Sequence, residues 1–327
     1  MDWQSDAWPA DRDLDAHPAA VAWRATGGDR LARIEYVRGN LERGKGRAIF
    51  RLFRSGSAGD TIIAKCRKSG PGERERIAYE RVLPLLSVPV PRCYGAHDDG
   101  SRVWLFVEDA RSERITLESP EHRACAARWL ARMHVEAAAL PCSWLPERGA
   151  AYYLGVLQQV RTAILDNLQN PAFRSDDVAV LQAVLARTAF LQSVWDRVER
   201  LCAAMPRTLV HGDFAAKNVF VRAEPAGLEL FVIDWEKIGW GVPAIDLSSL
   251  AREPAQQIEP SIYADAARLP PGEVAEWAVA GSIFRMLLAM EWSSQSLAFR
   301  WPAKPVGNLQ LYLREMERAL ACASWAS

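Results

Sequence analysis

The chain has 327 residues, of which 50% are hydrophobic and 24% charged, which is typical of a folded globular protein rather than a disordered or fibrous one. Lys and Arg together number 40, as do Asp and Glu, so no net field attracts nucleic acid or an anionic membrane, and we expect neither partner. The length exceeds that of a usual single domain and predicts two lobes with a cleft between them.

The N-terminal residues and the cysteines both indicate a reducing compartment. The first 20 residues carry acids and prolines where a signal peptide would need a basic start and an unbroken apolar run. No apolar stretch approaches the roughly 20 residues that cross a bilayer. The six cysteines are scattered, without a C-x-x-C pair or a His at zinc spacing, so we expect reduced thiols. Together these features predict a cytoplasmic protein.

The first third of the chain has the pattern of a small sheet with one helix. Residues 1–30 are polar and interrupted by Pro and Gly, and we interpret them as a leader segment with at most one short helix. Strand patterns then occur at residues 32–37, 48–53, 61–66 and 103–108. The first three are separated by turn-prone segments, which predicts an antiparallel meander. Apolar residues at helical spacing predict a helix of about four turns over 72–86, before the last strand.

The rest of the chain is mainly helical. Long runs of helical periodicity lie at residues 122–139, 152–168, 177–205, 273–292 and 309–323. One β-rich island interrupts them, with strands at 208–210, 219–221 and 228–234. This layout predicts an α+β fold, with an antiparallel sheet lobe at 31–109 and a larger helical lobe at 110–327.

The β-rich island contains the residues that indicate chemistry. Asp213 and Asn218 lie in a polar loop between two apolar strands, and Asp234 ends the next strand. Phosphoryl transfer needs a carboxylate near the attacking hydroxyl and oxygen ligands for Mg²⁺, and little covalent help from the protein. These three side chains meet that requirement.

The motif H-G-D-x-x-x-x-N at 211–218, followed by I-D-W-E at 233–236, resembles the aminoglycoside phosphotransferase and choline kinase family. The resemblance covers roughly residues 31–250 and implies a protein-kinase-like two-lobe fold that uses ATP and Mg²⁺, with GTP not excluded. It implies that Asp213 is the catalytic base or orients the acceptor hydroxyl, and that Asn218 and Asp234 bind the metal.

Two further residues of the family pattern have structural roles. The resemblance implies that His211 braces the loop by hydrogen bonds and is not the base. It also implies that Asp246 bonds the backbone of the same loop; its position at the start of a helix also fits simple capping. Gly212 stands where protein kinases carry an arginine that pairs with a phosphorylated activation loop, so we expect constitutive activity.

The family pattern also predicts a strand lysine paired with a helix glutamate in the sheet lobe. Lys65 ends the strand IIAK, and Glu75 shares a helix face with apolar residues, where a buried charge needs a partner. We expect these two to pair and Lys65 to meet the nucleotide phosphates. Lys68, Glu73 and Glu80 are the alternatives.

Four other expected nucleotide contacts rest on position in the chain. Glu108, Asp109 and Ala110 follow the buried strand and correspond to the hinge that meets adenine through its backbone. No G-x-G-x-x-G follows the first strand; a short basic turn at 43–47 stands there instead, and Lys45 could meet phosphate. A plain hairpin turn is the alternative.

Lys217 is a departure from many relatives, which carry Gly at this position. A cation here could neutralise the phosphoryl group during transfer; the alternative is a solvated loop lysine.

These features predict an enzyme that moves the γ-phosphate of ATP to a hydroxyl of a small molecule. The acceptor classes we consider are an aminoglycoside-like antibiotic, a sugar and an amino alcohol, in resistance or in natural-product tailoring. The alternatives are a pseudokinase scaffold that binds nucleotide and, with less support, a protein kinase, because no A-P-E segment follows Asp234. We expect a monomer or a homodimer.

Overall fold

The computed structural model describes residues 14–40, 47–56, 61–110, 113–225, 227–248 and 259–326. The chain divides into two compact units. The first, which we call the sheet unit, comprises Met1–Arg114 and Asn218–Ile238. The second, the helical unit, comprises Ile115–Lys217 and Gly239–Ser327. The sheet unit is therefore discontinuous in sequence, whereas the division at residues 30 and 110 expected above follows chain order.

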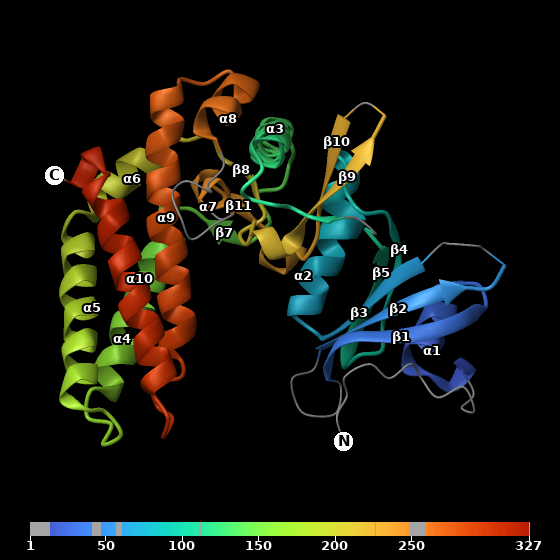
Figure 1. Cartoon of the computed structure of the whole chain (residues 1–327), viewed down its shortest axis with the longest axis horizontal. Helices are drawn as coiled ribbons and strands as arrows, with labels where there is room; N and C mark the ends of the chain where they lie inside the picture. Colours follow the sequence, from blue (N-terminus) through green and yellow to red (C-terminus); the bar gives the residue numbers. More distant parts are fainter. Residues whose placement is uncertain are drawn as a thin grey trace. The chain divides into compact units, whose positions relative to one another are not determined.

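A five-stranded antiparallel sheet forms the first part of the sheet unit (Figure 1). Its strands are β1 (Leu31–Asn40), β2 (Arg47–Arg54), β3 (Thr61–Lys68), β4 (Cys93–Asp98) and β5 (Arg102–Glu108), in the order β1-β2-β3-β5-β4. The first three form the predicted meander, which is confirmed. The sequence pattern missed β4, because five of its six residues are half-buried and the strand shows no clear alternation of apolar and polar residues.

One helix of the expected leader segment belongs to the core of this sheet. Helix α1 (Pro18–Ala25) begins with a proline after the N-cap residue His17, as the fixed φ of proline favours. Its buried face, including Trp23, packs in one cluster with Phe50, Cys66 and Phe106 of the strands. The six cysteines of the chain are all free thiols, and four are buried.

The predicted four-turn helix is one helical stretch that changes pitch. It consists of α2 (Pro71–Ile77), a π-helical turn η2 (Ala78–Val82) and a 3-10 turn η3 (Leu83–Leu85). Pro84 has no backbone N–H and cannot continue the α-helical hydrogen bonds, which explains the tighter last turn.

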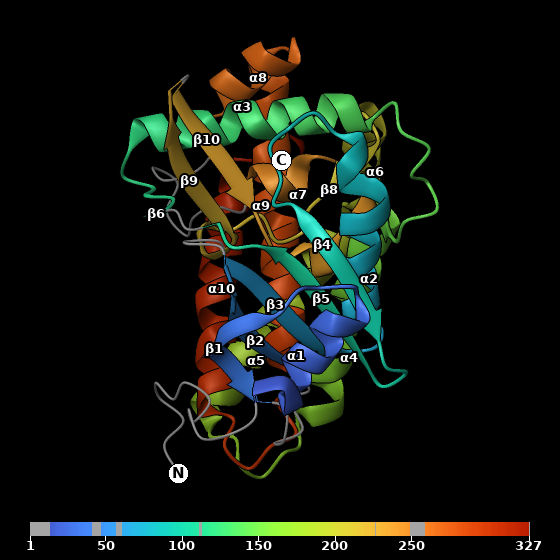
Figure 2. The same ribbon diagram turned by 90° about the vertical axis from the view of Figure 1, so that its right-hand side faces the viewer.

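A second, three-stranded sheet completes the sheet unit. Strand β9 (Val219–Glu224) forms an antiparallel hairpin with β10 (Gly227–Val232), and β6 (Glu113–Arg114) pairs with the other edge of β9. The hairpin leads into the turn η5 (Trp235–Lys237), where the Trp235 side chain is fully buried. Figure 2 shows β9 and β10 as one hairpin separate from the five-stranded sheet. Residues late in the chain are thus part of the sheet unit.

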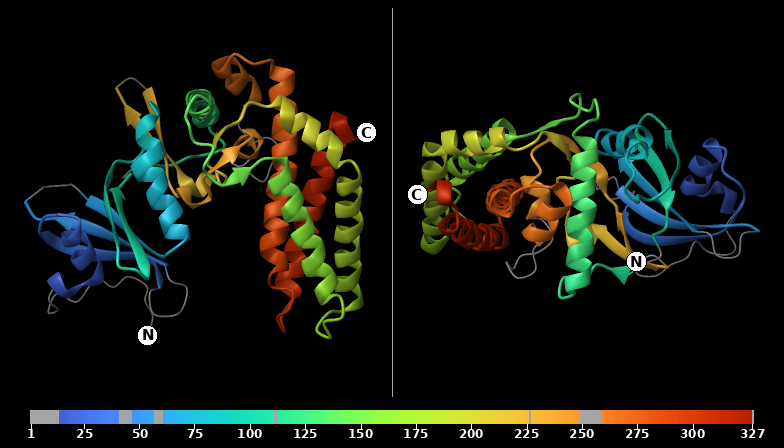
Figure 3. Two further views of the ribbon diagram at one scale, coloured as in Figure 1. Left: turned by 180° about the vertical axis from the view of Figure 1, so that it is seen from behind. Right: turned by 90° about the horizontal axis from the view of Figure 1, so that it is seen from above.

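The helical unit contains the long helices expected from the sequence. The predicted runs correspond to α3 (Pro120–Ala137), α4 (Ala150–Asn167), α5 (Ser175–Ser193), α6 (Trp195–Ala204), α9 (Pro271–Ser294) and α10 (Ala303–Ala321). Two shorter helices, α7 (Ala244–Leu247) and α8 (Pro260–Ala267), lie outside those runs. The run predicted over 177–205 is divided at Val194, which is non-helical and produces a bend of 57°. Figure 3 shows α4, α5, α9 and α10 packed side by side.

Short strands and ring stacking support this helical unit. A small sheet consists of β7 (Glu147–Arg148), β11 (Gly239–Gly241) and β8 (Thr208–Val210). Strand β8 directly precedes the loop with the H-G-D-x-x-x-x-N motif at 211–218, which we call the motif loop. In the core, the rings of Tyr153 and Phe284 stack with centroids 4.0 Å apart. Among the described residues no single helix has the length and hydropathy of a membrane span; only α5 and α6 taken together reach these values across their bend.

Candidate active site

A buried aspartate in the helical unit holds the motif loop. Asp246 on α7 is fully buried; its Oδ2 accepts a hydrogen bond from the backbone N–H of His211 at 2.7 Å, and its Oδ1 accepts one from that of Gly212 at 2.9 Å. Gly212 has φ of +76°, which favours glycine because a Cβ is strained there. The sequence alternative of simple helix capping is therefore wrong, and Asp246 holds the loop backbone.

Two histidines complete this support. The Nδ1 of His211, a fully buried side chain, accepts a hydrogen bond from the backbone N–H of Asp213 at 3.2 Å, so the predicted bracing geometry is present. His134 on α3 lies with Nε2 3.3 Å from Asp246 Oδ2 and Nδ1 2.9 Å from the Tyr263 hydroxyl. Sequence reasoning missed His134; its only signal is a polar residue on the buried face of an amphipathic helix.

The two residues of the loop that we expect to act on substrate are more exposed. Asp213 and Lys217 form an ion pair, with Lys217 Nζ 2.7 Å from Asp213 Oδ2. Their side chains are 35% and 60% exposed. An exposed pair of this kind adds little to stability, so the fold does not require these side chains.

The predicted pair in the sheet unit is present and almost completely buried. Lys65 Nζ of β3 lies 2.5 Å from Glu75 Oε1 of α2, and the two side chains are 3% and 1% exposed. The competing Glu73 and Glu80 both pair with Arg76 instead. This part of the sequence interpretation is confirmed as a contact.

The β9–β10 hairpin places the two proposed metal ligands at the same end. Asn218 immediately precedes β9, and Asp234 lies two residues beyond the end of β10. Val219 pairs with Val232, and the backbone N–H of Ile233 donates to the Asn218 carbonyl oxygen at 2.9 Å. Asp234 has φ of 71°, a left-handed conformation that costs energy for a residue other than glycine and is frequent at functional sites.

The donor set at this hairpin fits Mg²⁺. Mg²⁺ favours carboxylate and carbonyl oxygens and usually keeps only one or two protein carboxylates besides phosphate and water. Asp234 and Asn218 supply one carboxylate and one amide oxygen. Within the described part of the chain, no three His, Cys, Asp or Glu side chains are grouped to hold a metal by themselves. These two side chains would therefore form only part of a metal's coordination shell, and phosphate and water would have to complete it.

Sequence reasoning missed an arginine and a glutamate beside these residues. Arg67 Nη2 lies 2.7 Å from Asp234 Oδ1, its Nη1 pairs with Glu236, and its Nε lies 3.4 Å from Glu75 Oε2. Lys65 Nζ is 3.3 Å from the same Asp234 oxygen. The available signal was strand alternation, because residues two apart on β3 face the same side. We call Lys65, Arg67, Glu75, Asp234 and Glu236 the five-charge cluster.

The residues expected to meet adenine, Glu108 to Ala110, make polar contacts within the sheet unit. Asp109 accepts hydrogen bonds from Arg51 Nε at 2.6 Å and from Thr61 Oγ1 at 2.7 Å. Arg222 of β9 contacts Glu108 Oε1 and donates to the Ala110 carbonyl oxygen, both at 3.1 Å. These contacts fix the segment after β5. Lys45 lies outside the described residues.

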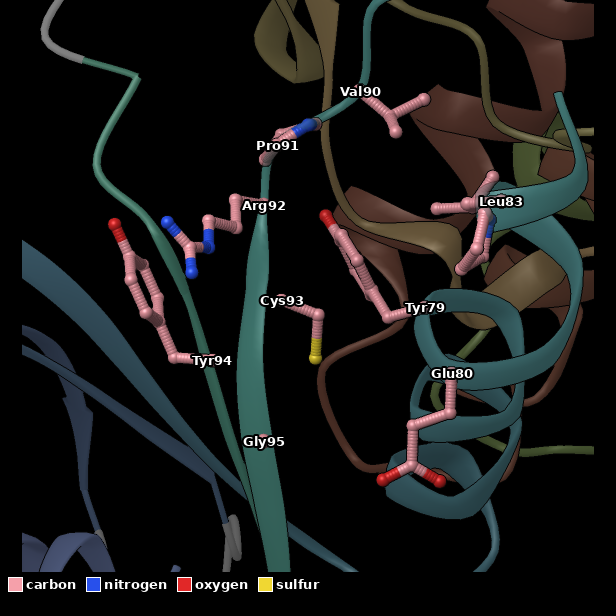
Figure 4. A pocket seen from close by; sticks show the side chains of 10 residues that line it. Tyr79, Glu80, Leu83, Val90, Pro91, Arg92, Cys93, Tyr94 and Gly95 are labelled. Carbon is pink, nitrogen blue, oxygen red and sulfur yellow. The ribbon is translucent and has the colours of Figure 1, made fainter. Parts of the chain in front are cut away.

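The sheet unit also has a cavity of about 500 Å³ between η2 and β4. Figure 4 shows Tyr79 from the helical stretch and Cys93 from β4 among its lining side chains. Burial, aided by the charges of Glu75 and Asp234, raises the pKa of Tyr79 well above its usual value. Of the residues predicted to bind nucleotide or metal, those that the structure describes do not line this cavity.

Solved structures show which fold these elements form. The GDP complex of aminoglycoside 2'-phosphotransferase-IIIa has a TM-score of 0.65 at 12% identity, covering 90% of this chain and 96% of that chain. The microcompartment-associated aminopropanol kinase has a TM-score of 0.62 at 16% identity, covering 92% and 97%. Choline kinase from Cryptosporidium parvum Iowa II has a TM-score of 0.57 at 11% identity, covering 88% and 90%. These similarities confirm the protein-kinase-like fold.

Sequence comparison gives the family. No curated protein sequence matches the chain. The model of the phosphotransferase enzyme family matches residues 36–278, which include most of the five-stranded sheet, the motif loop and both proposed metal ligands. Because this match extends over most of the chain, the chain belongs to the phosphotransferase enzyme family.

Proposed function

We propose that this phosphotransferase moves the γ-phosphate of ATP to a hydroxyl group of a small molecule and requires Mg²⁺. The observation that carries the proposal is the buried contact of Lys65 with both Glu75 and Asp234, at 2.5 and 3.3 Å. Kinase-like enzymes need the lysine–glutamate pair and the metal-binding aspartate in place together. A scaffold without catalytic function has less support, because Lys65, Asp213, Asn218 and Asp234 are all present in the chain.

The loop in the helical unit supplies the residues for the acceptor. Asp213 would orient the attacking hydroxyl and accept its proton, as a positioned general base does. Lys217, whose ammonium lies 2.7 Å from that carboxylate, would neutralise charge that develops on the phosphoryl group. Asp246 and His211 hold the loop backbone, and we assign them no contact with substrate.

The residues of the sheet unit would bind the nucleotide. Lys65 would contact its phosphates, and Asn218 and Asp234 would bind Mg²⁺, which when bound neutralises phosphate charge during transfer. The backbone of Glu108, Asp109 and Ala110 would meet the base. We retain Lys45 as a further phosphate contact and do not exclude GTP.

The relatives support the acceptor class that we propose. Structures with this fold include kinases named for an aminoglycoside, for aminopropanol and for choline. We therefore propose an acceptor that carries both a hydroxyl and an amino group, with a sugar as the wider class, in resistance or natural-product tailoring. Gly212, in place of the arginine of protein kinases, supports a small-molecule acceptor. We expect a cytoplasmic enzyme, as a monomer or a homodimer.

Magnesium-dependent ATP consumption against a panel of aminoglycosides, amino alcohols and sugars tests this function. Asp213→Asn should lower kcat about 100- to 10,000-fold, the usual contribution of a general base. The matched control is Asp196→Asn, which removes another exposed carboxylate paired with a cation four residues away; its kcat should stay unchanged. Activity that survives in Asp213→Asn would remove this residue from the mechanism, and nucleotide binding without turnover on any acceptor would favour a scaffold.

A further inference from the structure

The five-charge cluster contains more cationic charge than the proposed catalysis requires. Lys65 alone makes the contacts with Glu75 and Asp234 that nucleotide binding needs. Arg67 repeats both contacts and adds Glu236. Its side chain is only 11% exposed, so these interactions are poorly screened by solvent. Arg67 is therefore a second buried cation that the lysine–glutamate pair does not account for.

The geometry of Arg67 favours arginine over lysine at this position. Three different nitrogens of its guanidinium lie against three different carboxylates. A planar fork with five N–H donors can do this, whereas the ammonium of lysine is a point charge. Arg74 of α2 adds a hydrogen bond to the Glu236 carbonyl oxygen at 3.1 Å. The carboxylate that we propose as metal ligand is thus held by a cation that is itself fixed on three sides.

The formal charge of the cluster depends on Arg67. Two cations and three carboxylates give −1; without Arg67 the remaining lysine and three carboxylates give −2. A divalent cation entering the present cluster would meet a fixed guanidinium that contacts the same Asp234 oxygen, and this repulsion is strong where charges are little solvated. The phosphates of a nucleoside triphosphate bring enough negative charge to offset it.

We propose that Arg67 makes metal binding at Asp234 dependent on the nucleotide. The guanidinium disfavours a free divalent cation, and the polyphosphate of a bound nucleoside triphosphate removes that penalty. The ion consequently binds as a metal–nucleotide complex. Arg67 is a specificity-determining residue of the site, and its role rests on the function proposed above.

Binding of Mn²⁺ as a surrogate for Mg²⁺, followed by electron paramagnetic resonance and calorimetry, tests this role without turnover. In the absence of nucleotide, Arg67→Met should bind Mn²⁺ at least about tenfold more tightly than the wild type, because the nearest repulsive charge is lost. With a non-hydrolysable ATP analogue present, the two proteins should differ much less. Arg67→Lys keeps the charge and should resemble the wild type in weak binding of the free ion.

Arg76→Met is the matched control. Like Arg67→Met, it removes an arginine that pairs with glutamates. Arg76 and its partners Glu73 and Glu80 all lie on the helical stretch of α2 and η2, outside the cluster, so this change should not alter Mn²⁺ affinity. If Arg67→Met does not fold, as judged by circular dichroism, Arg67→Gln replaces it. Its amide can still donate to a carboxylate, and because it is also neutral we expect the same tighter binding of free Mn²⁺.

Unchanged or weaker binding of free Mn²⁺ by the neutral variants would overturn the proposal. So would an Arg67→Lys variant that binds the free ion as tightly as Arg67→Met, since charge would then not be the cause. A wild-type protein that fails to bind the Mn²⁺–nucleotide analogue at all would instead refute the proposed function, on which this inference depends.

Discussion

The two units position their functional groups by opposite means. In the five-charge cluster of the sheet unit, the side chains are 1% to 22% exposed and hold one another by ion pairs. In the motif loop of the helical unit, Asp213 and Lys217 are 35% and 60% exposed, and the backbone beneath them is held by the fully buried Asp246. In the sheet unit the proposed functional side chains thus hold one another in place. In the helical unit a separate residue, Asp246, holds the loop that carries them.

This difference determines what a substitution should do. Removing one member of a buried ion-pair cluster leaves an uncompensated charge and destabilises the fold. Removing Asp213 should affect activity alone, because its exposed ion pair contributes little to stability. Function and stability are therefore separable in the helical unit and coupled in the sheet unit.

The largest effect on stability should come from Asp246→Ala. This change leaves the buried N–H groups of His211 and Gly212 without their acceptor and removes the contact of Asp246 with His134 Nε2. Loss of charge-assisted bonds in a buried site should lower the free energy of unfolding by about 3–5 kcal/mol. Urea unfolding measures this decrease in the free energy of unfolding. Turnover should fall as well, although Asp246 is not assigned any contact with substrate.

Asp246→Asn serves as the graded control. Its amide keeps one acceptor oxygen, so it should lose only part of the stability that the alanine variant loses. If both variants unfold like the wild type while turnover falls, Asp246 does not stabilise the motif loop in the way the structure shows. The contrast drawn above between the two units would then be wrong for the helical unit.

A pH-dependent effect should come next in size, from the buried imidazole of His17 in the sheet unit. His17 is 4% exposed, and burial lowers its pKa to about 4 from the usual 6.5. Its Nδ1 accepts the backbone N–H of Ala19 at 3.0 Å. Above pH 6.5 the ring is neutral in both states, and its full contribution to stability is present. Below that pH the unfolded chain binds a proton that the folded chain does not, so stability falls until about pH 4.

Relative to neutral pH, the free energy of unfolding should fall by about 1 kcal/mol at pH 5.5 and by about 3 kcal/mol at pH 4. Urea unfolding of the wild type and of His17→Asn, which keeps an acceptor at the helix start, isolates this contribution. The wild type should lose more stability than the variant as the pH falls from 7 to 5. Parallel pH profiles would show that His17 is not buried as described.

Lys217→Met should have a smaller effect, confined to activity. If the ammonium neutralises the transferring phosphoryl group, kcat should fall at least about tenfold with little change in KM for ATP. The unfolding free energy should change by less than about 1 kcal/mol, because the ion pair with Asp213 is exposed. Arg200→Met, which breaks another exposed pair four residues apart, is the control. Unchanged turnover would make Lys217 a solvated loop lysine.

The same comparison shows what the sequence could predict. The motif loop, the meander and the Lys65–Glu75 pair were accessible because strand patterns, spacing and a family motif are local signals. The partners of Arg67 were not, since Asp234 and Glu236 lie 167 and 169 residues away in the chain. For the same reason no local pattern assigned the β9–β10 hairpin to the sheet unit. Contacts between distant segments depend on packing, which local periodicity does not specify.

The smallest effect, opposite in sign, should come from the buried phenols. The hydroxyl groups of Tyr79 in the sheet unit and Tyr153 in the helical unit have no hydrogen-bond partner among the residues that the structure describes. A buried polar group without a partner is destabilising, so Tyr79→Phe and Tyr153→Phe should each raise the free energy of unfolding by about 1 kcal/mol. Tyr263→Phe, which loses the hydrogen bond to His134, should lower it by a similar amount. If Tyr79→Phe is instead destabilising, its hydroxyl has a partner in solution, and water in the adjacent cavity is the first candidate.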